Sequence, residues 1–112
     1  MVFKKKIRQH LITQWTQQLA LLLQAHLPLA QALQLLAKTS MNPPLRNLTL
    51  TLYQDVMNGL PLSQALAAYP FYFDSTYRQL IIAAEQSGRL AVILQRIAAQ
   101  QMAQEQLRAQ LL

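Results

Sequence analysis

Proline and glycine interrupt this chain at only a few points. Glycine occurs twice and proline five times in 112 residues, and most of the residues between them are leucine, glutamine and alanine. Within these segments apolar residues recur every three or four positions, which is the spacing of one face of an α-helix. A β fold would need more turn glycines and more β-branched residues. The pattern therefore predicts an all-α chain.

The prolines and glycines also set the expected limits of six helices. We expect helices over about 7–25, 28–38, 45–58, 61–68, 74–86 and 90–112, with a break over 39–44. The third helix carries two apolar stripes, formed by Leu45, Leu48, Leu52 and Val56 and by Leu50, Tyr53 and Met57. A helix that is apolar on two sides is expected at the centre of a bundle. In the first helix, Trp15 lies in the middle of the apolar stripe and is expected in the core.

Basic residues concentrate at the start of the chain. Ten Lys and Arg against four Asp and Glu give a net charge of +6, and the first acidic residue is Asp55. The early cations are Lys4, Lys5, Lys6 and Arg8. Such a segment can contact an anionic membrane surface or nucleic acid, or simply remain solvated. The other six cations are spread along residues 38–108, which disfavours a recognition helix for nucleic acid.

Several classes of function find no support in the composition. The absence of cysteine excludes disulfides, thiolate metal sites and cysteine nucleophiles. The two glycines are isolated, so no phosphate-binding loop is present, and the two histidines lack metal-ligand spacing. The longest apolar runs, such as 19–23 and 80–84, have five residues and fall far short of the roughly 20 residues of a membrane span. We expect no catalytic residue, no metal and no cofactor.

One heptapeptide occurs twice. Residues 27–33 read LPLAQAL and residues 60–66 read LPLSQAL, so six of the seven positions match at a separation of 33 residues. Each copy starts a helix after a tight turn, where the missing N–H of proline costs nothing. We interpret Pro28, Leu29, Pro61 and Leu62 as structural helix starts.

A second motif, AEQSGRL over 84–90, follows a Tyr-Pro turn and the aromatic residues Phe71, Phe73 and Tyr77. With the order of the helices and the repeated heptapeptide, it resembles the cytoplasmic domain of the type II secretion F and type IV pilus inner-membrane platform proteins over about residues 12–110. The family signature Gly-Glu-x-Ser-Gly-x-Leu is matched by Glu85, Ser87, Gly88 and Leu90.

The chain departs from the family pattern at three places. Ala84 stands where the signature begins with glycine, and Ala91 stands where an acidic residue is frequent. Ala25-His26 replaces a frequent Ala-Gly before Pro28.

The resemblance implies a six-helix bundle of antiparallel helices that self-associates as a dimer or a larger homo-oligomer. It implies a basic segment over 1–9 and one cytoplasmic domain over 10–112, whose last helix extends toward a missing transmembrane span at the bacterial inner membrane. The implied partners are a cytoplasmic assembly ATPase, inner-membrane assembly proteins, and pilins or pseudopilins. The implied role is a non-catalytic scaffold for pilus assembly, secretion or DNA uptake. The alternative is a small basic helical nucleic-acid-binding domain.

Glu85 is the acidic residue of most interest. It lies near the carboxyl end of a helix, where the helix dipole disfavours a negative charge, so we expect a compensating partner. Arg78, Arg89 or the amides that open the sixth helix could provide it. We interpret Glu85 as a structural carboxylate, with a partner contact or a metal as alternatives. With Ala91 in place of an acid, the oxygen ligands are too few for a divalent cation.

Phe71, Tyr72 and Phe73 form an aromatic cluster beside a proline turn. Two interpretations remain open. The cluster packs as a lid on the bundle, or together with Arg78 it forms a partner surface.

Overall fold

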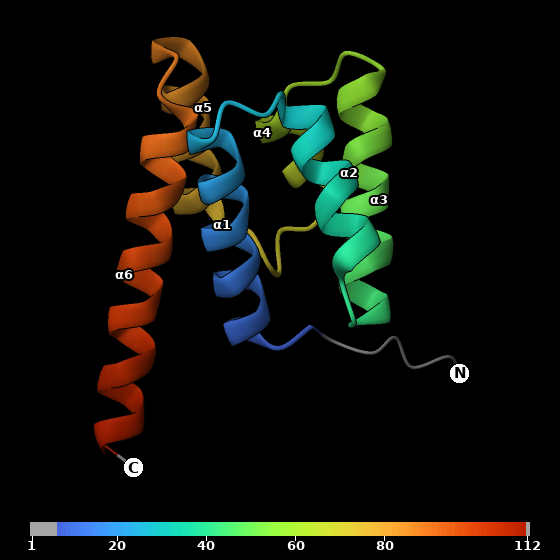
Figure 1. Cartoon of the computed structure of the whole chain (residues 1–112). Helices are drawn as coiled ribbons and strands as arrows, with labels where there is room; N and C mark the ends of the chain where they lie inside the picture. The colour runs from blue at the N-terminus through green and yellow to red at the C-terminus, as the bar shows by residue number, and fades with distance from the viewer. Residues whose placement is uncertain (1–6, 112) are drawn as a thin grey trace.

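The structure is a computed structural model that describes residues 7–111, and Figure 1 shows that this part of the chain is all-α. Lys4, Lys5 and Lys6 lie outside the described residues. The helices are α1 (Gln9–Gln24), α2 (Leu29–Thr39), α3 (Pro43–Met57), α4 (Leu62–Leu66), α5 (Ser75–Ser87) and α6 (Leu90–Leu111). The prediction of six helices is confirmed. Over residues 7–111 no helix has both the length and the apolar character needed to cross a membrane.

The connection between α2 and α3 is shorter than the sequence predicts. Thr39 still belongs to α2, while Pro43 and Pro44 form the first turn of α3 instead of lying in the break. Asn42 caps α3, because its side-chain oxygen accepts a hydrogen bond of 3.0 Å from the N–H of Leu45. Prolines fit the first turn of a helix since no N–H is needed there.

The six helices form a closed ring. Each helix packs against the next one in the sequence, and α6 packs against α1 to close the circle. In Figure 1, α1 lies between α6 and α2 and runs antiparallel to both. The interior of the ring is filled by apolar side chains from all six helices and from the segment before α5.

The last helix extends beyond this ring. Figure 1 shows the carboxyl end of α6 running past the start of α1. Leu107 and Leu111 there are exposed. Before this point α6 is tied to α1, because the buried hydroxyl of Thr13 lies 2.8 Å from Oε1 of Glu105.

The prediction that the third helix is central is wrong. Figure 1 shows α3 at the edge of the bundle beside α2. Its packing against α2 and α4 buries Leu45, Leu48 and Leu52, whereas Leu50 and Met57 on the second stripe remain 42% and 60% exposed. Periodicity shows that a face is apolar but does not show that another helix covers it.

Two polar contacts cross the interior from α1. The indole N–H of Trp15 donates to the hydroxyl of Thr49 on α3 at 3.0 Å. Thr16 donates its single hydroxyl hydrogen to the carbonyl of Ile12, so in the 2.8 Å contact with Tyr77 the phenol is the donor. Burial raises the pKa of the Tyr77 phenol above its usual value. Trp15 is buried, as predicted, and its side chain helps hold α1 to α3.

Candidate functional site

The signature residues form the turn from α5 to α6. Gly88 follows α5 with φ of +69°, and the N–H of Arg89 donates to the carbonyl of Ala84 at 3.0 Å. Glycine adopts this left-handed backbone without steric cost, which closes the helix. Leu90 begins α6 and is half-buried against the core. Gly88 and Leu90 thus set the direction in which α6 leaves the turn.

Ser87 completes the end of α5. Its exposed hydroxyl donates to the carbonyl of Ala83 at 3.0 Å. Serine in the last turn of a helix bonds in this way to the carbonyl four residues earlier, which also accepts a backbone N–H of the helix. The hydroxyl therefore acts as part of the helix end.

Glu85 joins α5 to the start of α4. Its Oε2 accepts from the backbone N–H of Ser63 at 3.0 Å, and its Oε1 accepts from the Ser63 hydroxyl at 2.6 Å. Ser63 lies in the first turn of α4, where backbone N–H groups have no intrahelical acceptor. The half-buried carboxylate thus provides the acceptor that this helix lacks.

The expected partners of Glu85 are wrong. Neither Arg78, Arg89 nor the amides that open the sixth helix hold the carboxylate, because Ser63 supplies both hydrogen bonds. Ser63 lies 22 residues earlier in the chain, beyond the range of local sequence reasoning. One feature of the sequence distinguishes Ser63. It is the single position at which the second heptapeptide differs from the first, which has Ala30.

The helix-start residues have the same geometry in both heptapeptides. Pro28 has φ and ψ of −58° and 147°, and Pro61 has −59° and 147°. Each proline stands just before its helix, and Leu29 and Leu62 are the first helical residues. These four residues set where α2 and α4 begin.

The aromatic cluster divides between the core and the surface. Phe73 is fully buried, with its ring centroid 5.5 Å from that of Trp15 and 5.0 Å from that of Tyr77. It therefore cannot contribute to a partner surface, which corrects the inclusion of Phe73 in that surface. Phe71 is 72% exposed and meets Tyr72 edge to face at 5.4 Å.

Tyr72 and Arg78 occupy intermediate positions. Tyr72 is half-buried, and its hydroxyl accepts a hydrogen bond of 3.1 Å from the N–H of Ile7. Ile7 is buried, so the segment that precedes α1 already contributes to the core. Arg78 is half-buried on α5, and Arg8 is exposed just before α1. Across residues 7–111, no three His, Asp or Glu side chains gather in a way that could hold a metal ion.

A known protein family matches the chain over most of its length. The sequence profile described as type II secretion system (T2SS), protein F, matches residues 15–112. The chain belongs to the type II secretion system protein F family. The resemblance drawn from the signature and the repeated heptapeptide is thereby confirmed.

Named relatives in this family come from both secretion and pilus systems. The chain is 35% identical over 96 residues to the type II secretion system protein F of Vibrio cholerae, which covers 86% of this chain and 24% of that protein. It is 35% identical over 107 residues to the type IV pilus assembly protein PilC of Pseudomonas aeruginosa. This match covers 96% of the chain and 29% of PilC. It is 36% identical over 96 residues to the type IV pilus assembly protein TapC of Aeromonas hydrophila. This match covers 86% of the chain and 23% of TapC. The chain spans about a quarter of the length of these protein F relatives.

The two motifs that identified the protein F family meet in space. The signature supplies Glu85 and the second heptapeptide supplies Ser63, and these two residues share both hydrogen bonds of the carboxylate. The candidate site is therefore a structural junction of α4, α5 and α6.

Proposed function

We propose that this chain is a non-catalytic platform domain for the assembly of type IV pili or type II secretion pseudopili. The observation that carries the proposal is the protein F profile over residues 15–112, with relatives named for both systems. In this proposal residues 10–112 form one domain on the cytoplasmic side of the bacterial inner membrane, and residues 1–9 form a basic lead-in of which Ile7 packs into the core.

The domain acts through protein contacts. It binds a cytoplasmic assembly ATPase, inner-membrane assembly proteins, and pilins or pseudopilins, and it relays ATPase-driven movement as a homodimer or larger homo-oligomer. The closed ring of helices supports this role, because a force applied at one helix is passed to both of its neighbours. The Glu85–Ser63 junction supports it further by tying the short α4 to α5.

The basic lead-in contacts the membrane. Lys4, Lys5, Lys6 and Arg8 are placed against the anionic cytoplasmic leaflet, where each cation contributes about 1 kcal/mol. An excess of Lys and Arg on the cytoplasmic side also orients the membrane helices that accompany such a domain.

The test uses the turn after α5 in the complete protein. We expect Gly88→Val to abolish surface pili or secretion, because a β-branched residue at φ of +69° strains the turn that directs α6. Gly88→Asn is the matched control, since asparagine tolerates this conformation, and it should retain output. Normal output from the Gly88→Val protein, present at the wild-type level, would argue against the proposal.

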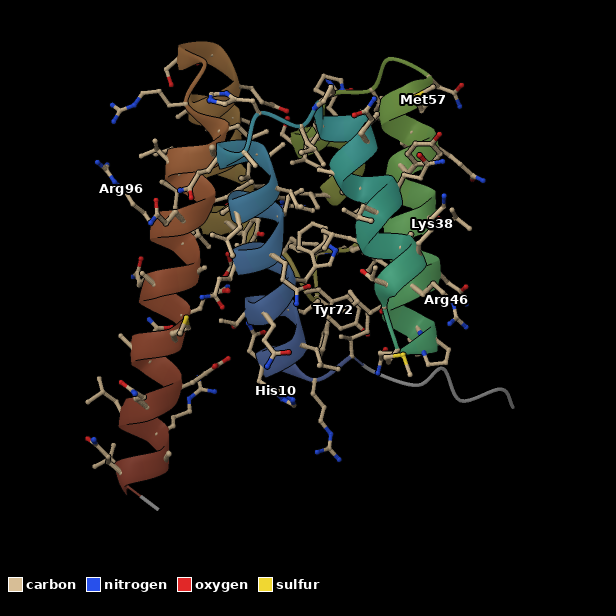
Figure 2. The ribbon with its side chains drawn as sticks, viewed as in Figure 1. His10, Lys38, Arg46, Met57, Tyr72 and Arg96 are labelled. Atoms are coloured by element: carbon tan, nitrogen blue, oxygen red, sulfur yellow. The ribbon has the colours of Figure 1, made fainter. Side chains whose placement is uncertain are left out.

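The nucleic-acid alternative has its own test. Figure 2 shows Arg96 on the α6 side of the bundle and Lys38 and Arg46 on the opposite side, an arrangement that does not favour one basic stripe. Nucleic-acid binding through Lys and Arg weakens steeply as salt rises. Tight DNA binding by the purified chain with a steep loss in salt would support the alternative and count against the platform.

A further inference from the structure

A groove of about 730 Å³ runs between α1 and α2. Trp15 and Leu36 form its buried floor, and the connection between α2 and α3 closes one end. The volume lies in the range of about 300–1,000 Å³ that is typical of binding pockets. The junction around Glu85 does not use this groove, which we call the α1–α2 groove.

Large apolar side chains stand exposed around the α1–α2 groove. Leu21 is 58% exposed, Leu35 41% and Met41 93%, and all three line it. Leu21 also lines a second hollow of about 180 Å³ between α1 and α6. It thus forms a ridge between two hollows. Grouped exposed apolar side chains of this kind mark an interaction surface.

Uncharged and basic side chains occupy separate parts of this face. Among residues 7–111, no charged side chain lines either hollow. Three cations lie at the outer edges: Figure 2 shows Arg96 on the side of α6 away from α1, and Lys38 and Arg46 on the side of α2 away from α1. All three are exposed. The face therefore has a neutral apolar centre and basic edges.

This arrangement decides between two kinds of occupant. If a second copy packed on the same face about a two-fold axis, Arg96 would approach either its own counterpart or Lys38 and Arg46. Like charges across an interface oppose association. A partner with acidic edges would meet attraction at both edges and an apolar surface at the centre.

We infer that the α1–α2 groove binds an amphipathic helix with an aliphatic ridge and acidic flanks. Grooves between helices recognise such helices through apolar residues at every third and fourth position. The inference rests on the proposed function, since the helix would belong to a component of the assembly machinery. The homodimer of the platform would then use a different surface.

The single tryptophan of the chain provides the test. Trp15 lines the groove, so its fluorescence should change when a tryptophan-free helix fills the groove. The probe is a synthetic helix of about five turns with leucines at every third and fourth position and glutamates on both flanks. We expect saturable binding to the complete chain that weakens several-fold when salt shortens the Debye length from about 30 Å to about 8 Å.

Matched variants locate the binding site. Leu21→Asp should weaken binding of the glutamate-flanked peptide at least about tenfold, because it places a charge on the apolar ridge. Leu107→Asp is the control: Leu107 is 59% exposed, against 58% for Leu21, and lines neither hollow. It should leave the affinity unchanged. A peptide with lysines in place of the glutamates should bind at least about tenfold more weakly. Circular dichroism verifies that both variants are folded.

Four results would overturn the inference. Equal affinity for the two peptides would show that the basic edges do not select acidic flanks. Unchanged binding to the Leu21→Asp variant would show that the peptide binds outside the α1–α2 groove. If deletion of residues 2–6 changes Trp15 emission in the absence of peptide, the chain's own amino-terminal segment occupies the groove. If the chain is a dimer and Leu21→Asp converts it to a monomer, a second copy of the chain occupies the groove. Because the titration requires no pilus or secretion output, its failure would leave the platform role standing.

Discussion

The two Leu-Pro-Leu turns, at 27–29 and 60–62, have the same backbone conformation, but only the second is hydrogen-bonded to a distant side chain. After α1 the N–H of Leu27 donates to the carbonyl of Leu22 at 3.2 Å, and after α3 the N–H of Leu60 donates to the carbonyl of Asp55 at 3.0 Å. The residue before each leucine has a positive φ, +66° at His26 and +92° at Gly59. Each turn therefore ends its helix with the same left-handed closure.

The two turns differ in the helix that each one starts. α2 has 11 residues, and Ala30 in its first turn has no hydroxyl. α4 has only five residues, and Ser63 at the corresponding position binds Glu85. A helix this short is unstable without tertiary contacts. The comparison shows one turn conformation in two settings, and only in the second does a distant carboxylate supply an acceptor to the helix that follows.

The largest expected effect comes from removing the tie that only the second turn has. Glu85→Ala should lower the free energy of unfolding by about 2 kcal/mol, because it removes two charge-assisted hydrogen bonds and leaves the N–H of Ser63 without its acceptor. Urea denaturation measures the change. Asp55→Ala, in a half-buried acid of α3, is the control and should change stability by less than about 0.5 kcal/mol. Equal effects of the two substitutions would show that the bonds between Glu85 and Ser63 add no stability beyond that of another half-buried acid.

A smaller effect is expected at the left-handed residue of the second turn. Gly59→Ala should destabilise the chain by about 1 kcal/mol, because an L-residue at φ of +92° is strained. A Cβ at this position would meet no atom within 4 Å, so the cost is conformational rather than steric crowding. Thermal unfolding of the variant measures it. A melting temperature equal to that of the wild type would show that the closure is not strained at this residue.

The smallest effect is expected at the equivalent residue of the first turn, with the opposite sign. His26→Gly should stabilise the chain by up to about 1 kcal/mol, since glycine relieves the strain at φ of +66° but loses more entropy on folding. Ala25→Gly is the neighbouring control: its φ is −79°, so it should stabilise nothing. A loss of stability in the His26→Gly variant would mean that the imidazole contributes a contact that outweighs the strain.

The helices are predictable from the sequence because their limits are local. Proline, glycine and the apolar period mark where α1, α2, α5 and α6 begin or end. The predicted start of α3 is late because two prolines suggest a break, whereas the Asn42 cap makes them a first turn. On the second stripe of α3, Leu50 and Met57 are exposed because no helix covers them, which the sequence does not show, while Tyr53 packs half-buried against the core.

The site is harder to predict because its contacts are distant in sequence. The signature indicates Glu85 and Gly88, and the turn forms where expected. The partner Ser63 escapes prediction because a contact across 22 residues leaves no periodic pattern. Phe71 and Phe73 are the same residue type two positions apart, and packing against Trp15 and Tyr77 distinguishes the buried ring from the exposed one. The membrane contact of Lys4, Lys5 and Lys6 stays a prediction.

The central claim is that the signature carboxylate acts through Ser63. A double-mutant cycle with Glu85→Ala, Ser63→Ala and the combined variant tests it directly by urea denaturation. Since Glu85 accepts the hydroxyl of Ser63 at 2.6 Å, we predict a coupling energy of about 1 kcal/mol or more. Independent losses that add to within about 0.3 kcal/mol would contradict the account.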